Sequence, residues 1–305
     1  MLIRRPRFQR SAQVSPIRLT PRDLEVVRHI ARHRFLRSSQ IAVLMASSRQ
    51  QILRRLNLLY HHGYLERPRC QIDYYYAGGS RSMVYGLGKR GFAMLHRMDG
   101  LRSSYPGKST EPVKRLFLEH TLQVAEFMVR LELACRQHGA VKLIPADQLV
   151  LPDETRNQRE PFQWKVSIKS MDKIGVIPDH VFGLEWKDQT NKPHRAYYFL
   201  ESDLGTMPIE RRGLHQSSLL RKLLAYASTW EQNLHQTRLG FHRFRVLFVT
   251  NTPARAGNLI ETARQLERGS GLFLSTDFEA LQQTPYLLTH PWQTTRPGVP
   301  ATLLE

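Results

Sequence analysis

The sequence predicts a two-domain chain of α+β or α/β type. Its first third has the pattern of three short helices followed by a β-hairpin, and the rest follows the order α-β-β-β-α-β. The two parts differ in charge, and a stretch rich in Gly, Ser and Pro separates them. With 305 residues, 41% of them hydrophobic, the chain is long enough to bury two cores. We expect a basic arm at 1–18, a first domain at 19–98, a linker at 99–112, a second domain at 113–284 and a loosely ordered tail at 285–305.

Most of the positive charge lies in the first third of the chain. Residues 1–115 contain 23 Lys and Arg against 6 Asp and Glu, whereas the remainder contains 22 against 20. This excess favours a polyanion as the partner of the first domain. Because the basic residues are spread over several elements instead of one amphipathic helix, nucleic acid is favoured over a membrane surface.

The sequence carries no sign of secretion or of membrane insertion. No apolar run approaches the ~20 residues that span a bilayer, and the basic N-terminus lacks the apolar core of a signal peptide. Cys70 and Cys135 lie far apart and form no metal-ligand pair. We therefore expect a reduced, cytoplasmic protein.

The first two helices of the first domain are predicted from their start signals. Thr20 and Pro21 suit the N-cap and the first turn of a helix, and Asp23 favours the positive end of the helix dipole. Ser38 and Ser39 then precede a short second helix. The apolar residues of the first helix recur at helical spacing, at Leu24, Val27, Ile30 and Ala31.

A third helix is expected after Ser48, ending at Gly63, a residue type common just past a helix end. Two strand-like segments follow at 70–77 and 83–87, joined by a Gly-rich tip, and residues 88–98 are expected to form a closing helix. The apolar face of the third helix consists of Ile52, Leu53, Leu56 and Leu59.

Three helices followed by a hairpin are the element order of a winged helix-turn-helix domain. In such domains the N-terminal end of the third helix enters the major groove, and the hairpin tip reaches phosphates or the minor groove. The alternative is a structural helical domain with a solvated basic face. We expect contacts with double-stranded DNA from Ser48, Arg49, Gln50, Arg54, Arg55 and Arg81.

The second domain alternates helix and strand signals after the linker. Residues 152–175 are polar and irregular, and we expect a loop with some strand there. The expected elements are a helix at 113–138, strands at 141–151, 176–186 and 195–203, a helix at 213–235, a strand at 244–250, a helix at 253–268 and a short strand at 272–275.

Acidic residues stand on two neighbouring strands of this domain. The stretch RAYYFLESDLGT runs from an apolar strand into Glu201 and Asp203, whose side chains share one face of the strand. The preceding strand carries Asp179, which we expect beside Glu201. Two converging carboxylates raise each other's pKa unless a divalent cation such as Mg²⁺ neutralises them, and Mg²⁺ can activate water to attack phosphate. The alternatives are a solvated strand end or a buried cluster of ion pairs with Arg211, Arg212 or Lys222.

Pro-Asp on one strand and Glu-x-Asp on the next, within this order of elements, resemble the core of the PD-(D/E)xK nucleases. The resemblance implies a restriction-endonuclease-like second domain. Many of these enzymes have a lysine two residues after the Glu, where this chain has Asp203; in some members a helix supplies it, and Lys222 is then the candidate. An acid from the first helix also occurs in that superfamily, here Glu119 or Glu126. The resemblance implies a catalytic set of Asp179, Glu201, Asp203 and Lys222, and a metal set of Asp179, Glu201 and Glu126.

A wider resemblance extends roughly from Leu19 to Thr250 and is to the replication-relaxation family. The most distinctive part is Glu-x-Asp-x-Gly-Thr followed by Lys-x-x-x-Tyr, whereas the helix-turn-helix part is generic. The family implies a DNA-binding protein of a plasmid or integrative element, with replication or mobilisation proteins as further partners. The matching segments are LTPRDLEVVRHIARHRFLRSSQIA, LRRLNLLYHHGYLERP, VYGLGKRGFAML, EHTLQVAEFMVRLELA, IPDHVFGL, YYFLESDLGTMPIERR and RKLLAYASTW.

Two other functions stay open on the sequence alone. One is a Mg²⁺-dependent DNA endonuclease or nickase that uses Asp179, Glu201 and Lys222 and is guided by the first domain. The other is a transcriptional repressor that binds DNA as a homodimer and has no further role.

Overall fold

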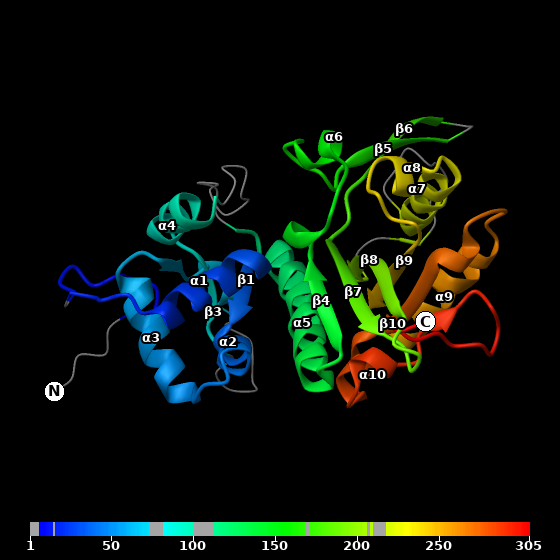
Figure 1. The fold of residues 1–305 in the computed structure, drawn as a ribbon. Helices are drawn as coiled ribbons and strands as arrows, with labels where there is room; N and C mark the ends of the chain where they lie inside the picture. The colour runs from blue at the N-terminus through cyan, green and yellow to red at the C-terminus, as the bar shows by residue number, and fades with distance from the viewer. Residues whose placement is uncertain are drawn as a thin grey trace. The chain divides into compact units, whose positions relative to one another are not determined.

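The computed structural model describes residues 6–14, 16–72, 82–100, 113–168, 171–205, 208–209 and 218–305. The chain divides into two compact units, residues 1–129 and 130–305, each of mixed α and β structure (Figure 1). The boundary between the units falls inside helix α5 (Arg115–His138). Most of the expected linker, residues 101–112, lies outside the described residues.

Helices α1 and α3 of the N-terminal unit begin where their caps predict, whereas the predicted cap Ser38 is itself the first residue of α2 and Arg37 is the N-cap. Helix α1 (Pro21–His33) starts after Thr20, whose side chain accepts a hydrogen bond from the Asp23 backbone. The helices that follow are α2 (Ser38–Leu44), α3 (Arg49–His61) and α4 (Lys89–Asp99). Gly63 follows α3 with φ of 79°, a left-handed conformation that favours glycine.

A three-stranded antiparallel sheet in the order β1-β3-β2 completes this unit, with β1 at Phe35–Arg37, β2 at Leu65–Glu66 and β3 at Val84–Leu87. The strand expected from Cys70 is not formed at its start, since a 3-10 helix occupies Arg69–Gln71.

The side chain of Gln71 replaces the missing strand backbone beside β3. Its Oε1 accepts from the Val84 backbone N–H at 2.7 Å, and its Nε2 donates to the Val84 carbonyl at 3.1 Å. The Pro68 carbonyl accepts from the Gln71 backbone at 3.4 Å and so closes the turn. The rest of the expected first strand and the hairpin tip with Arg81 lie outside the described residues.

Close backbone contact joins α4 to the end of α3 in the N-terminal unit. A Cβ atom at Gly88 would lie 2.3 Å from the carbonyl oxygen of Gly63, and one at Gly91 would lie 2.3 Å from that of Tyr64. Only glycine fits at either position. Val27, Ile30, Leu36, Leu56 and Leu59 are fully buried in the core beneath.

The C-terminal unit is built on a mixed six-stranded sheet with the order β11-β10-β9-β8-β7-β4 among the described residues. Strands β4, β7 and β8 are antiparallel neighbours, whereas β8, β9 and β10 run parallel. The strands are β4 (Val141–Pro145), β7 (His180–Lys187), β8 (Pro193–Asp203), β9 (Phe244–Thr250), β10 (Phe273–Asp277) and β11 (Gln293–Thr294).

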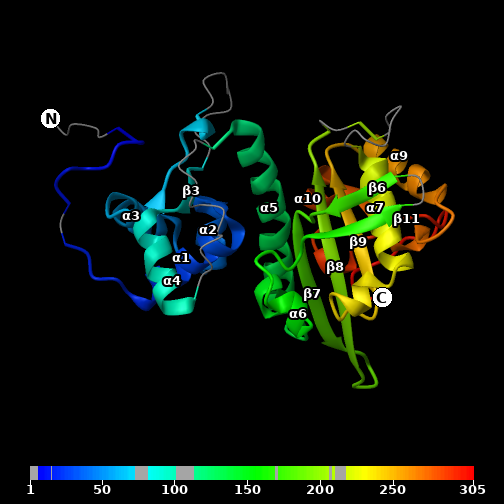
Figure 2. The ribbon, with the colours of Figure 1, turned by 90° about the horizontal axis from the view of Figure 1, so that it is seen from above.

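Two helices cover one face of this sheet (Figure 2). Helix α7 (Leu219–Glu231) and helix α9 (Pro253–Arg264) pack their apolar residues against Phe199 of β8 and Phe248 of β9. The helix expected at 213–235 is interrupted, because Asn233 takes a left-handed conformation before the short helix α8 (Leu234–Thr237), and residues 213–217 lie outside the described residues.

The strand predicted at 176–186 starts later in the structure, at His180, and Val176 is the last residue of a separate strand. Strand β6 (Met171–Val176) ends before Pro178, and β7 begins at His180, so Asp179 lies in the turn between them. Proline has no N–H to donate to a sheet, which explains the break. Strand β5 (Trp164–Ile168) pairs with β6. A short helix, α6 (Asp153–Arg156), lies in the same polar region.

The C-terminal segment is ordered, contrary to the loosely ordered tail expected from the sequence. Helix α10 (Phe278–Gln283) precedes β11, which pairs with β10. Trp292 is fully buried, and the Tyr198 hydroxyl donates to the Leu303 carbonyl at 2.6 Å. The large apolar side chains of the segment, interspersed among polar residues, supply the burial that fixes it.

Candidate functional site

The N-terminal half of α3 carries exposed polar residues that are predicted from the sequence to contact DNA. Ser48 caps the helix by accepting a hydrogen bond from the Gln51 backbone at 3.3 Å. Arg49, Gln50 and Arg54 are all exposed. Arg81, predicted to contact DNA from the hairpin tip, lies outside the described residues.

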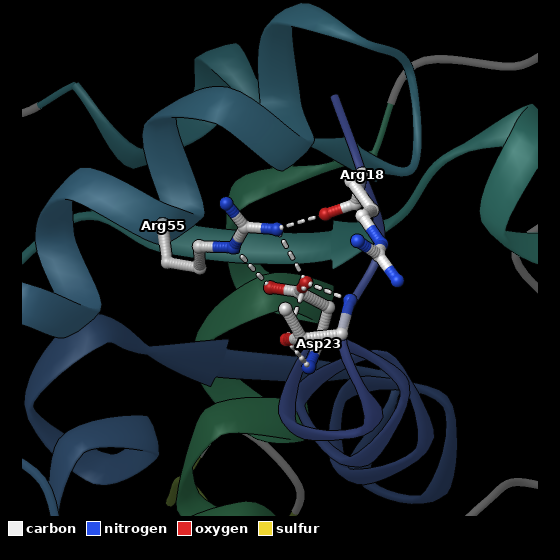
Figure 3. A network of polar contacts seen from close by, with 4 residues as sticks. Arg18, Asp23 and Arg55 are labelled. Atoms are coloured by element: carbon white, nitrogen blue, oxygen red, sulfur yellow. Dashed lines mark hydrogen bonds and ion pairs between the residues drawn. The ribbon is translucent and has the colours of Figure 1, made fainter. Parts of the chain in front are cut away.

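Arg55 differs from its neighbours on α3, because its guanidinium binds inside the unit (Figure 3). Its Nε and Nη2 atoms each donate to Asp23 of α1 at 2.5 Å, and Nη2 also donates to the Arg18 carbonyl at 2.8 Å. The Asp23 side chain is 1% exposed and that of Arg55 31%. Arg55 therefore connects α3 to the start of α1, and substitution there would disturb the fold as well as any DNA contact.

The carboxylate of Asp23 has an unusually complete set of partners. Besides Arg55, it accepts hydrogen bonds at 2.7 Å from both the backbone N–H and the hydroxyl of Thr20. Burial alone raises the pKa of this carboxyl, but the bonds from Arg55 and Thr20 outweigh burial, and the pKa is lowered. Asp23 is therefore an ionised structural group.

A second group of polar side chains gathers at the end of β8 in the C-terminal unit. Glu201 is almost fully buried, and one of its oxygens bonds to the Lys222 ammonium of α7. The other accepts from the Tyr226 hydroxyl at 2.5 Å. Lys222 and Tyr226 are four residues apart, so both side chains lie on the face of α7 that meets the sheet. The structure thus brings Glu201 and Lys222 together.

Asp179 lies next to this group. Its Oδ2 accepts from the Ser202 backbone N–H at 2.8 Å, which holds the turn before β7 against the end of β8. Burial raises the pKa of Glu201 and the charge of Asp179 raises it further; Lys222 and Tyr226 offset this only in part, leaving a pKa of about 7. Asp179 therefore lies close enough to the Glu201–Lys222 pair for its charge to act on both groups.

Lys222 and Tyr226 respond to the same acidic surroundings. Burial lowers the pKa of Lys222, but Glu201 and Asp179 raise it more, so the net pKa is raised and the ammonium stays protonated. Burial and the neighbouring Glu201 both raise the pKa of the Tyr226 phenol. The Lys222 side chain is 32% exposed and that of Glu201 3%, so Lys222 lies between the buried carboxylate and solvent.

Asp203 has a different partner from Glu201, although both point to the same side of β8. It forms an ion pair with Arg255 in the first turn of α9 and accepts from the Gly205 backbone at 3.1 Å. Arg255 therefore balances the charge of Asp203. Asp203 still contributes to the electrostatic field that raises the pKa of Lys222.

The acids proposed from the first helix of the second domain lie in the N-terminal unit. Glu126 accepts a hydrogen bond from the Gln40 side chain at 2.6 Å. Glu119 pairs with Arg115 one turn earlier on α5. The arginines 211 and 212, weighed as partners of Glu201 and Asp203, lie outside the described residues.

Two residues of this site were not predicted from the sequence. Tyr226 could have been predicted from the sequence. In Lys-x-x-x-Tyr the two side chains lie on the same face of a helix, so the Tyr226 hydroxyl is expected close to the group that Lys222 binds. Arg255 had no such signal, because nothing in its local sequence indicates an acid on β8 as its partner.

Comparison with known proteins identifies the family of the chain. Among the described residues, no helix combines the length and apolarity needed to cross a membrane. No curated protein and no solved structure matches the chain. A family model described as replication-relaxation matches residues 27–243, which include α3 as well as Glu201, Lys222 and Tyr226. Because this match covers well over half of its length, the chain belongs to the replication-relaxation family.

Proposed function

We propose that the protein binds double-stranded DNA through α3 and acts in this way in the replication or relaxation of a plasmid or other mobile element. The family supports the biological setting. The observation that supports DNA binding is the exposed polar surface on the N-terminal half of α3. Among the described residues, no acidic side chain balances the positive charge of Arg49 and Arg54 on this surface.

Several features support a winged helix-turn-helix arrangement around this surface. Helices α1, α2 and α3 are followed by β2 and β3, and β3 lies between β1 and β2 in one antiparallel sheet. Ile52, Leu56 and Leu59 form the buried side of α3, whereas Gln50 and Arg54 lie on the opposite side and Arg49 is exposed at the start of the helix. A capped helix end with Ser, Arg and Gln side chains offers donors to phosphates and to base edges.

Charge reversal at two exposed arginines tests this proposal. We expect Arg49→Glu/Arg54→Glu to weaken binding of a labelled mixed-sequence duplex at least tenfold, on the order expected for lost phosphate contacts. The slope of log K against log salt concentration should become shallower by about 2. Fluorescence anisotropy over a series of salt concentrations measures both quantities.

The matched control is Arg32→Glu/Arg97→Glu, which makes the same charge change at exposed arginines in the last turns of α1 and α4. If both double variants weaken binding equally, binding depends on net charge and α3 has no special role. Unchanged binding in the α3 variant would contradict the proposal.

A second candidate function is Mg²⁺-dependent cleavage or nicking of DNA by the C-terminal unit. The antiparallel β4-β7-β8 meander, the crossover through α7 and the parallel strand β9 support the resemblance to PD-(D/E)xK nucleases. The convergence of Asp179, Glu201 and Lys222 at the end of β8 favours it further.

The donor set suits Mg²⁺, because carboxylate oxygens are its preferred protein ligands and each has a second lone pair available. Asp179 and Glu201 would hold the ion, which would activate a water and stabilise charge on the phosphate. In the described structure Lys222 donates to Glu201, so the ion would share that carboxylate with the ammonium. Lys222 would then supply a positive charge beside the bound ion.

Incubation of supercoiled plasmid with Mg²⁺ or Mn²⁺ tests this candidate. We expect nicked or linear product from the wild type and none from Asp179→Ala, Glu201→Gln or Lys222→Met. Glu185→Gln is the matched control, because this exposed β7 acid pairs with Arg195 away from the end of β8. Product that persists in the three site variants would rule out this centre.

A further inference from the structure

The segment that precedes α1 is attached to α3 at several points. Arg67 donates to the Arg7 carbonyl at 2.7 Å, and Arg55 donates to the Arg18 carbonyl at 2.8 Å. Between them, the backbone N–H of Ser11 donates to Nδ1 of His61 at 3.0 Å. Three separate backbone positions of the segment are thus held by α3 or by the residues that follow it.

Arg10 adds a side-chain anchor to these backbone bonds. Its Nε donates to the Tyr60 carbonyl at 2.9 Å, and its Nη2 donates to the Leu65 carbonyl and to Glu66, both at 3.1 Å. Arg10 thereby binds the last turn of α3 at Tyr60, whose carbonyl also accepts from the Gly63 backbone, and the start of β2 at Leu65. Residues 7–14 and 16–18, which we call the docked arm, therefore lie along α3 from its middle to its C-terminal end; Figure 1 shows the dark blue chain beside that end.

The docked arm borders the exposed face of α3. Arg67 donates to the Asn57 side chain at 2.9 Å as well as to the arm, and its guanidinium lies 4.0 Å from the Tyr60 ring centroid. Asn57 is three residues after Arg54, so the two lie on one side of the helix. Arg67 thus ties the arm to the face that carries Arg54.

The anchoring leaves positive charge on the arm available. The carbonyls of Arg7 and Arg18 are bound, but the side chains of both residues are exposed. A segment already held in place loses little conformational freedom when its side chains bind a ligand, which favours affinity. The arm therefore presents beside α3 two exposed arginines whose backbone is already held in place.

We propose that the docked arm is a second DNA-contacting element, in which Arg7 and Arg18 bind phosphates of the same duplex that α3 contacts. This inference rests on the proposed DNA-binding function and adds residues outside the third helix to it. Arg10 and Arg67 act on the arm as positioning residues, because their guanidinium groups are engaged within the unit.

Neutral substitution of the two exposed arginines tests the inference in the full chain. Arg7→Gln/Arg18→Gln keeps the backbone carbonyls and hence the anchors, while it removes two charges. With a labelled mixed-sequence duplex, the salt slope should fall by about 1.8, and the variant's relative defect should shrink roughly tenfold between about 50 and 200 mM salt. The control Arg32→Gln/Arg97→Gln should leave the slope within about 0.5 of the wild type.

A double-mutant cycle tests the positioning role of Arg67. Arg67→Gln should weaken binding by releasing Arg7 from its place, so adding Arg7→Gln should weaken it by less than the product of the two single effects. Circular dichroism confirms that each variant is folded.

The outcomes separate this inference from the proposed function. An unchanged slope in Arg7→Gln/Arg18→Gln, together with weak binding by Arg49→Glu/Arg54→Glu, would overturn the arm contacts and leave α3 in place. If the arm variant loses slope, the arm contacts DNA whatever the α3 variant does. Independent effects of Arg7 and Arg67 would overturn the positioning role.

Discussion

Each unit of the molecule buries a carboxylate against a cation that comes from a helix, and the pKa values of Asp23 and Glu201 are shifted in opposite directions. Asp23 in the N-terminal unit pairs with Arg55 of α3, and its pKa is lowered. Glu201 in the C-terminal unit pairs with Lys222 of α7, and its pKa is raised to about 7.

The difference follows from the number and kind of partners. Asp23 has a planar, two-pronged guanidinium, two bonds from Thr20 and the positive end of α1. Glu201 has one ammonium and one hydroxyl, and a second carboxylate, Asp179, repels its charge. The partners of Asp23 stabilise its ionised form. Glu201, with a pKa of about 7, changes between its protonated and ionised forms near neutral pH.

This contrast distinguishes a structural ion pair from a group suited to chemistry. Groups whose pKa lies near the working pH serve proton transfer and metal binding, and they gather at functional sites. Asp23 has no such property, and its role is to connect α1 to α3. The comparison therefore supports the end of β8, and not the Asp23 pair, as the place for chemistry.

The largest expected effect is the difference between removing the two cations. Arg55→Met leaves Asp23 buried and charged, and we expect a loss of about 3 kcal/mol in the N-terminal unit, on the scale seen for broken buried pairs. Lys222→Met should destabilise the C-terminal unit by only about 1 kcal/mol near pH 6, because Glu201 takes up a proton at little cost. The destabilisation caused by Lys222→Met should be about 1 kcal/mol larger near pH 8 than near pH 6.

The positions of the tryptophans allow the two units to be followed separately. All 4 tryptophans lie in the C-terminal unit, so tryptophan fluorescence during urea unfolding reports on that unit. Hydrogen exchange of peptides from α1 and α3 reports on the other. Equal losses for the two variants at both pH values would contradict the proposed difference in tuning.

The second expected effect is a pH dependence carried by Glu201. Its pKa is higher in the folded protein than its ordinary value of 4.5, so between about pH 4.5 and 7 the folded state binds more protons than the unfolded state. Stability of the C-terminal unit should therefore fall as pH rises through this window, by up to about 3 kcal/mol.

Glu201→Gln removes this titration, so the fluorescence-monitored stability of the variant should lack that part of the slope. The measurement is made with EDTA present so that no divalent ion contributes. Asp23 has the opposite effect on stability. Because its pKa is lowered, it stabilises the folded N-terminal unit above pH 3.8, its ordinary pKa, and this stabilisation is lost as pH falls below that value. Parallel slopes for wild type and Glu201→Gln would refute the assignment.

The smallest expected effects come from the two helix caps beside these carboxylates. Thr20→Ala removes the cap of α1 and a hydrogen bond to Asp23, and we expect a loss of about 1.5 kcal/mol. Ser218, whose hydroxyl accepts from the Arg221 backbone at 3.2 Å, only caps α7. Ser218→Ala should therefore lower stability by about 1 kcal/mol, and hydrogen exchange in the first turns of α1 and α7 measures both. A larger loss from Ser218→Ala would show that the bond to Asp23 contributes nothing.

Much of the N-terminal unit could be predicted from the sequence because its signals are local. The caps Thr20 and Ser48 marked the starts of α1 and α3 correctly, and Gly63 marked the end of α3. The strand expected from Cys70 was wrong at its start, since its place beside β3 is taken by a side chain, Gln71. A side chain that substitutes for backbone leaves no periodic pattern to detect.

In the C-terminal unit the sequence predicted the main strands better than their edges. The apolar run before Glu201 is a central strand as expected, and Glu201 and Asp203 share its face. Pro178 broke the preceding strand and moved Asp179 into a turn. The prediction of a loosely ordered tail was wrong, because Trp292 and Leu303 are buried against parts of the unit that are distant in the sequence.

The sequence by itself determined the charge asymmetry, the family motifs, most helix starts and the side of β8 on which the acids stand. Only the tertiary structure decided which cation balances which acid. Asp23 and Arg55 are 32 residues apart, Glu201 and Lys222 are 21 apart, and Asp203 and Arg255 are 52 apart. Caps and strand faces depend on neighbours a few residues away, whereas ion-pair partners are chosen by long-range packing of helices on sheets, which short-range patterns do not encode.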